Sequence, residues 1–298
     1  MTGIVGVVTV SSIAGVATGL GALPVFVRHR VTHRVYDAAL GLAAGLMVAA
    51  SVFGLIVPGM EEGTLSAVMV GLLLGGGALL AGNYAIPHLH AQYRAWLPEG
   101  GATGGDAAVM ASDGTGGPDR ERSEFADPAG STDSVGAAES ADAAAEREGI
   151  LRKALLIGGA ITLHNAPEGL AIGVAFASGL EEVALVLAVV IGLQNVPDGF
   201  AFAVPMAETG MSNLRVIWYT TLSGVVPQVV ASVFGFLLVG LAAGLFPVAS
   251  GFAAGAMLAV VFRELIPSSH GHGHADAATG AFLVGFVLLV VVDAVVVV

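Results

Sequence analysis

Two similar phrases lie in consecutive apolar segments of the chain: His164-Asn165-Ala166-Pro167-Glu168-Gly169-Leu170-Ala171 and Gln194-Asn195-Val196-Pro197-Asp198-Gly199-Phe200-Ala201. Each phrase contains, in order, a polar residue, Asn, an apolar residue, Pro, an acid, Gly, an apolar residue and Ala. An ionisable group inside a membrane helix costs roughly 2.5–3.5 kcal/mol on insertion scales, so each repeated acid indicates a functional site if the segments span a bilayer. Paired, interrupted segments of this kind are typical of midplane binding sites in transporters.

The composition indicates that the segments do span a bilayer. Of the 298 residues, 55% are hydrophobic and only 11% are charged, with a mean hydropathy of +0.85, whereas a soluble domain has about 25% charged residues. A span needs about 20 apolar residues, and the first stretch is too long for a signal-peptide core. We therefore predict an all-α membrane protein with eight transmembrane helices, over 3–27, 37–60, 64–87, 151–178, 183–206, 215–241, 247–267 and 277–298.

One long connection differs from the others. Twelve of the 23 acidic residues lie between Glu99 and Glu148, in a segment rich in Gly, Ala, Ser and Asp that cannot bury enough apolar surface to become ordered. The predicted organisation is helices 1–3 over 1–93, a disordered acidic loop over 94–150, and helices 4–8 over 151–298. The chain has no basic tract that would suit a nucleic acid, and it has no Cys for disulfides or thiolate ligands.

The basic residues predict the orientation. If the N-terminus lies outside and the helices alternate, all eleven fall in or beside inside connections, as the positive-inside rule requires: Arg28, Arg30, Arg34, Arg94, Arg120, Arg122, Arg147, Arg152, Lys153, Arg215 and Arg263. The outside connections carry Glu61, Glu62, Glu181 and Glu182 and no Lys or Arg. We therefore expect a multi-pass protein of the cell membrane, embedded in the lipid bilayer, with both termini extracellular and the long loop cytoplasmic.

The spacing of the two phrases predicts a metal site. His164 and Glu168 are four residues apart, and so are Gln194 and Asp198, which places each pair on one helix face. Asn165 and Asn195 lie about 100° around each helix and widen the arc of ligands. Imidazole with carboxylate suits Zn²⁺, Fe²⁺, Mn²⁺ or Co²⁺, whereas Ca²⁺ prefers oxygen alone. Two carboxylates would neutralise one divalent cation.

The phrases resemble the ZIP (Zrt/Irt-like) family of divalent metal transporters, and within it the GufA-like prokaryotic branch. His164-Asn165-x-Pro167-Glu168-Gly169 is similar to the family's fourth-helix motif. The run from Met47 to Phe53, followed by Pro58 and Glu61, looks like the family's second helix. Gly255-Ala256-Met257 with Phe262-Arg263-Glu264-Leu265-Ile266-Pro267 looks like its seventh.

The resemblance implies a ZIP-like bundle with a binuclear-type metal site between helices 4 and 5. The main site would be His164, Glu168, Gln194 and Asp198 with Met47 nearby; Asn165 and Asn195 would serve an adjacent second site, and Glu264 would line the cytoplasmic exit. It further implies uptake of Zn²⁺, or of Fe²⁺, Mn²⁺, Cd²⁺ or Co²⁺, by a homodimer. The metal would be the transported substrate rather than a cofactor, and the protein would not be an enzyme.

Four departures from the family pattern reduce or move negative charge. Asp198 stands where Glu is usual, Asn195 stands where some members have an acid, and Arg263 stands where His is common beside Glu264. The phrase Leu222-Ser223-Gly224-Val225-Val226-Pro227-Gln228 lacks a Glu that this branch usually carries. One metal ion per cycle is therefore a safer expectation than two.

Other readings of the sequence remain open. Glu168 and Asp198 would also suit a proton- or sodium-coupled carrier of another solute, and a membrane-embedded His and acid would suit an intramembrane metallohydrolase, although the HExxH motif is absent. A metal sensor that does not transport is a further alternative. His270, His272 and His274 alternate with Gly near the predicted cytoplasmic end of the seventh helix, either as a weak metal receiver or sensor or as a polar turn.

Overall fold

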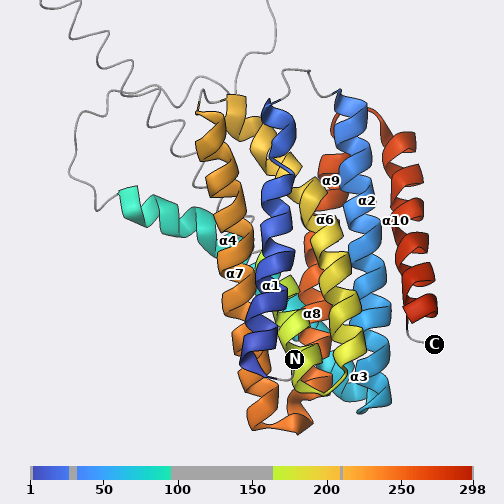
Figure 1. The fold of residues 1–298 in the computed structure, drawn as a ribbon. Helices are drawn as coiled ribbons and strands as arrows, with labels where there is room; N and C mark the ends of the chain where they lie inside the picture. Colours follow the sequence, from blue (N-terminus) through green and yellow to red (C-terminus); the bar gives the residue numbers. More distant parts are fainter. Residues whose placement is uncertain (1–2, 27–31, 95–163, 209–210, 297–298) are drawn as a thin grey trace, which may run out of the picture. The chain divides into compact units, whose positions relative to one another are not determined.

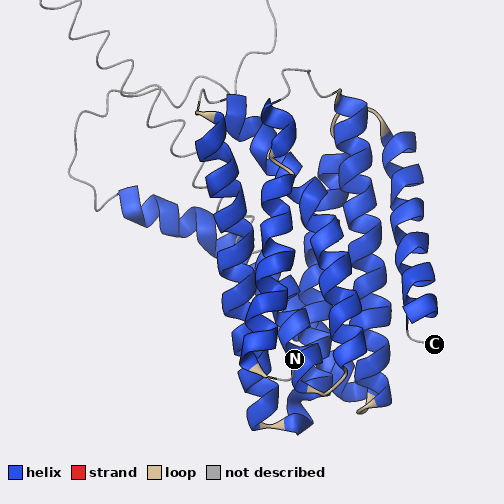
Figure 2. Ribbon diagram, viewed as in Figure 1, coloured by secondary structure: helices blue, strands red, loops and turns tan. Residues whose placement is uncertain are grey.

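Helices make up almost all of the described chain (Figure 2). The computed structural model describes residues 3–26, 32–94, 164–208 and 211–296, and none of these residues lies in a strand. Residues 95–150 of the predicted acidic loop, and residues 151–163 at the start of the predicted fourth helix, lie outside the described part. The all-helical class expected from the sequence is therefore confirmed for the residues that can be compared.

The elements follow one another along the chain as labelled in Figure 1. They are α1 (Ile4–Leu20), η1 (Leu23–Phe26), α2 (His33–Ser51), η2 (Val52–Ile56), α3 (Val57–Glu61), α4 (Leu65–Arg94), a helix over 164–177, α6 (Glu181–Glu208), α7 (Asn213–Leu241), η3 (Ala243–Leu245), α8 (Phe246–Val260), η4 (Val261–Leu265), α9 (Ile266–Ser269) and α10 (Ala275–Val296).

Six helical stretches of the described chain are long and apolar enough to cross a membrane. They are His33–Glu61, Leu65–Gly82, Glu181–Val204, Asn213–Leu241, Ala243–Ser269 and Ala275–Val295. The predicted first helix, 3–27, is shorter than expected because α1 ends at Leu20, and Leu23–Phe26 form a 3₁₀ turn around Pro24. Proline disfavours α-helical geometry in the residue before it, which explains the break.

The helices around the repeated phrases pack closely through glycine. Helix α1 packs against both α6 and α7, and α2 packs against α6, α8 and α10 (Figure 1). A Cβ atom on Gly169 would collide with the carbonyl of Gln228 on α7, and one on Gly199 would collide with the carbonyl of Thr18 on α1. These two glycines therefore permit close backbone approach between the helices.

Two of the predicted helices each contain a π turn. The second span is interrupted at Val52–Ile56 and the seventh at Val261–Leu265. The sequence repeats here as well, because Val-Phe begins both turns and Pro58 or Pro267 follows each of them. A proline offers no amide hydrogen and crowds the carbonyl four residues earlier, and a wider turn relieves that conflict. Such turns are frequent at functional sites, and the second one contains Glu264.

Candidate metal site

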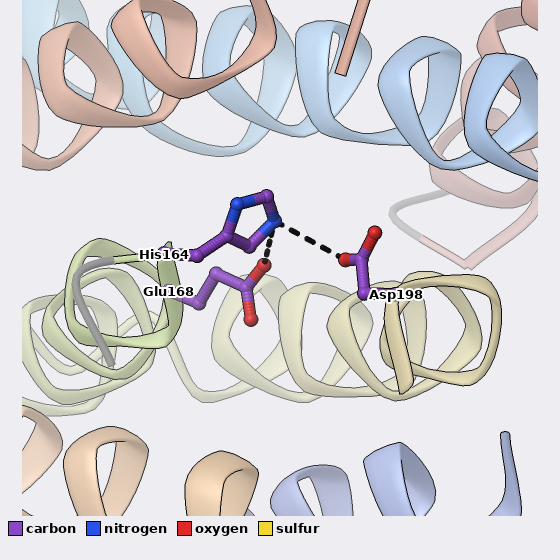
Figure 3. Close-up of side chains that lie close together, drawn as sticks. All are labelled: His164, Glu168 and Asp198. Atoms are coloured by element: carbon purple, nitrogen blue, oxygen red, sulfur yellow. Dashed lines mark hydrogen bonds and ion pairs between the residues drawn. The ribbon is translucent and has the colours of Figure 1, made fainter. Parts of the chain in front are cut away.

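Two neighbouring helices bring three metal-type ligands together. His164 and Glu168 lie one turn apart on the helix over 164–177, and Asp198 lies on α6 (Figure 3). One ligand atom from each residue lies within 4.8 Å of the others, and in the described chain this is the one group of three or more His, Cys, Asp or Glu that meets this condition. The pair four residues apart in the first phrase, His164 and Glu168, and the acid of the second phrase, Asp198, thus lie together.

The distances within this group suit a small divalent ion. The Nε2 atom of His164 is 3.2 Å from Oδ2 of Asp198 and 3.8 Å from Oε1 of Glu168. Zinc binds nitrogen and oxygen at about 2.0–2.2 Å, so adjacent ligands of a tetrahedral site lie about 3.4 Å apart. The observed separations lie on either side of this value, and an ion requires only small side-chain shifts.

Glu168 and Gln194 each keep one buried oxygen atom without a hydrogen-bond donor in the part of the chain that the structure describes. The Glu168 side chain is fully buried; its Oε1 accepts a hydrogen bond from Nε2 of Gln194 at 2.5 Å. Its Oε2 atom and the Oε1 atom of Gln194 are buried without a hydrogen-bond partner among the described residues. A buried carboxylate oxygen without a donor is costly, and a cation bound to these oxygens would remove that cost.

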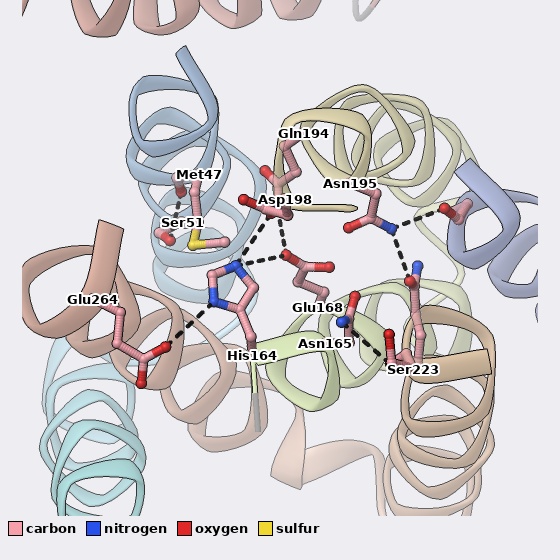
Figure 4. Close-up of polar contacts among 12 residues, drawn as sticks. Met47, Ser51, His164, Asn165, Glu168, Gln194, Asn195, Asp198, Ser223 and Glu264 are labelled. Atoms are coloured by element: carbon pink, nitrogen blue, oxygen red, sulfur yellow. Dashed lines mark hydrogen bonds and ion pairs between the residues drawn. The ribbon is translucent and has the colours of Figure 1, made fainter. Parts of the chain in front are cut away.

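Two further predicted residues flank the imidazole. The Oε2 atom of Glu264, in the π turn η4, is 3.9 Å from Nδ1 of His164. Met47 on α2 is fully buried and is drawn beside the His164 ring in Figure 4. A thioether is a soft ligand that selects softer metals, whereas Glu264 is a third carboxylate beside the ring, after Glu168 and Asp198.

The two asparagines form a polar link to other helices. The Nδ2 atom of Asn165 donates to the Ser223 carbonyl on α7 at 3.4 Å. The Nδ2 atom of Asn195 donates to the Ala14 carbonyl at 2.8 Å and to Oε1 of Gln228 at 3.0 Å (Figure 4). The sequence did not single out Gln228 as a site residue, although a polar residue in an apolar helix is a usable signal. Because it is a neutral amide, it adds no charge to the group.

A cavity of about 200 Å³ opens beside the ligands. Its lining includes His164, Asp198 and Glu264, and it extends to Tyr36 and Ser268 near the start of α2 and the end of α9. Nothing in the sequence pattern marked Tyr36. His164 and Asp198 therefore face a cavity that extends towards that end of the bundle, whereas Glu168 does not line it.

The sequence profile of the ZIP zinc transporter family matches residues 3–293 of this chain. The chain belongs to the ZIP family. It is 34% identical to the zinc transporter GufA of Myxococcus xanthus, with 95% of this chain and 96% of the relative covered. It is 36% identical to human zinc transporter ZIP11, with 93% of both chains covered, and 32% identical to zinc transporter ZIPB of Bordetella bronchiseptica, with 93% and 77% covered.

Membership of the ZIP family confirms several predictions from the sequence. The protein is a multi-pass membrane transporter of divalent metal cations and not an enzyme, with zinc as the metal named for the family. The metallohydrolase and the carrier of another solute are therefore set aside. The GufA-like branch is confirmed by the match to GufA along almost the whole of both chains.

The ZIP chain also has a second, acidic cavity, of about 620 Å³. Its lining includes the four glutamates that the sequence assigned to outside connections, together with one acid of the last helix: Glu61, Glu62, Glu181, Glu182 and Asp293. Acidic walls raise the local concentration of cations. Residues of three separate segments therefore contribute to one cation-attracting surface.

Proposed function

We propose that this ZIP protein carries Zn²⁺ through a site made by His164, Glu168, Gln194 and Asp198, with Met47 beside it. The observation that carries the proposal is the group of three ligand atoms within 4.8 Å of one another, from the buried His164 and Glu168 and the partly buried Asp198. The names of the relatives GufA, ZIP11 and ZIPB support zinc as the metal. Glu264 would accept the ion as it leaves, because it lies on the other side of the His164 ring and is 30% exposed.

The proposal includes eight spans, extracellular termini and movement of zinc into the cytoplasm. The distribution of Lys and Arg supports this orientation, and it places the acidic cavity at Glu61 and Glu181 on the outer side. The cavity beside Glu264 extends to Tyr36 near the start of α2, which the same orientation places on the inner side. A cation would thus be collected outside, bound at His164 and released inside. The family resemblance extends the proposal to a homodimer in the lipid bilayer.

We expect one tightly bound Zn²⁺ per chain. Glu168 and Asp198 together neutralise one divalent ion, and the side chain that α7 contributes, Gln228, is uncharged. Calorimetric titration of the purified protein should give one tight equivalent, which His164→Ala removes. Gln228→Glu places a carboxylate on α7 beside Asn195 and should add a second equivalent; two tight equivalents in the unaltered protein would contradict the proposal.

Transport is tested by Zn²⁺ influx into proteoliposomes. Saturable influx is expected, and it should fall to the level of empty liposomes in His164→Ala. Competition by Cd²⁺, Mn²⁺, Fe²⁺ and Co²⁺ ranks the metals, and imposed proton or sodium gradients test for coupling. Folded protein that binds zinc tightly but gives no influx would show that the site is a sensor rather than a carrier.

A further inference from the structure

A second histidine–carboxylate pair lies apart from the proposed transport site. Asp37 lies in the first turns of α2, and its carboxyl group is fully buried. Its Oδ1 atom is 2.8 Å from Nδ1 of His272, a residue 235 positions later in the connection between α9 and α10. Its Oδ2 atom has no hydrogen-bond partner in the described part of the chain. A buried carboxyl oxygen without a hydrogen-bond partner is costly, and a cation nearby would lower that cost.

The pairing determines which nitrogen of His272 is free. A carboxylate only accepts hydrogen bonds, so the proton of a neutral His272 lies on Nδ1 and the lone pair lies on Nε2. The side chain is 38% exposed, which leaves it accessible to an ion from solution. Histidines that bind metals almost always donate their other N–H to a carboxylate or carbonyl, which fixes the ring and raises its basicity. The Asp37–His272 pair has this arrangement before any metal is bound.

A second imidazole stands next to the first. The ring of His33, at the start of α2, stacks on the His272 ring with 4.4 Å between centroids and 18° between planes. Tyr36 packs edge-on against the His272 ring at 5.4 Å. Because His33 is exposed, rotation of its side chain can turn a ring nitrogen towards an ion held by His272. Two neighbouring imidazoles and water make a coordination shell that suits Zn²⁺ and related borderline cations.

The structure separates the three histidines of the turn. The Nδ1 atom of His270 is 2.9 Å from the Ile266 carbonyl and 3.0 Å from Oγ of Ser269, so this ring is tied back to its own helix. His274 is exposed, and the structure gives its ring no bond to a described residue. Only His272 reaches another helix. Of the three histidines in the His-Gly pattern, His272 is therefore the one whose ring is held by a carboxylate, as the ring of a metal-binding histidine often is.

The pair also lies close to the proposed path of the ion. Tyr36, which contacts the His272 ring, lines the same cavity as His164, Asp198 and Glu264. Ser268, at the end of α9, lines that cavity too. An ion that leaves the buried ligands through this cavity therefore emerges beside His272.

We propose that His272 and His33 form a second, weak divalent-metal site at the mouth of this cavity, with Asp37 as the buried carboxylate that positions His272. Two protein ligands hold a zinc ion less tightly than the three or four of catalytic and structural sites, and a site that must release its ion needs such weak binding. The role of receiving the ion from His164 rests on the proposed function, whereas metal binding at His272 does not.

Zinc titration of the full-length protein in detergent tests the inference through two classes of sites. We expect a tight class that His164→Ala removes, and a weak class that His272→Ala removes and His33→Ala weakens at least about tenfold. Asp37→Asn keeps an acceptor for Nδ1 but loses the charge, and should weaken only the weak class by roughly 10–100-fold. His274→Ala is the matched control and should change neither class.

The outcomes separate the two sites. A weak class that survives in His272→Ala, or that falls equally in His274→Ala, overturns the inference and leaves the transport site standing. A weak class that depends on His272 and Asp37 in a protein without a tight class supports the inference and counts against the proposed transport site. An unchanged tight class in Asp37→Asn shows that the variant is folded, so a loss confined to the weak class is not a folding defect.

Discussion

Zinc uptake by the Glu168→Gln variant should fall by at least roughly 100-fold. Even the outer partners of metal ligands are worth 10–100-fold, and in the proposed site Glu168 binds the ion itself. Its carboxylate is fully buried, Oε1 is held by Gln194, and Oε2 has no partner in the described chain. Glutamine has the same shape and can still accept the Gln194 bond, so the substitution removes the charge and one ligand oxygen and little else.

Thermal unfolding gives an independent measurement on the same variant. A ligand present at 100 times its dissociation constant stabilises a protein by about 2.7 kcal/mol. Zinc should therefore raise the midpoint temperature of thermal unfolding of the unaltered protein but not that of Glu168→Gln. Without metal, the variant should be no less stable, because a buried carboxyl group has been replaced by a neutral amide of similar volume. Asp276→Asn, an exposed acid in the first turn of α10, is the control and should retain full uptake. A Glu168→Gln protein with near-normal uptake would remove Glu168 from the site.

The Gly199→Ala variant should lose about 1–3 kcal/mol of stability, the usual cost of an extra methyl group in a tightly packed contact. A Cβ atom here would meet the carbonyl oxygen of Thr18, which is backbone and cannot rotate away. Helix α1 would have to move away from α6, and Asp198 precedes the substituted residue. We therefore expect a lower unfolding midpoint in detergent together with reduced zinc uptake.

Gly77→Ala is the matched control for this prediction. A Cβ atom on Gly77 of α4 would meet nothing within 4 Å, and alanine favours a helix over glycine by up to about 1 kcal/mol. This variant should be as stable as the unaltered protein or slightly more stable. Equal midpoints for Gly199→Ala and Gly77→Ala would show that the α1–α6 contact can relax, and that the close approach does not position Asp198.

The sequence predicted the helices well because a bilayer leaves the backbone few choices. In hydrocarbon every amide and carbonyl must be satisfied within the segment or a closed barrel, so an apolar run of sufficient length predicts a helix without knowledge of its neighbours. The pairing of His164 with Glu168 follows in the same way from helix geometry. The ends of helices were less predictable: α4 continues to Arg94, beyond the predicted end at 87, because an apolar run marks the hydrocarbon core and not the last helical hydrogen bond.

The sequence by itself determined the helical membrane class and the ZIP family and predicted the residue types of the proposed site, because each depends on local composition or on spacing along one helix. Only the tertiary structure decided which residues meet across helices. Asn195 bonds the carbonyl of Ala14, 181 positions away, and Asp37 bonds His272, 235 positions away. Such contacts depend on how the helices pack in three dimensions, here through glycines that allow close approach of the backbones. The periodicity of the sequence does not predict them.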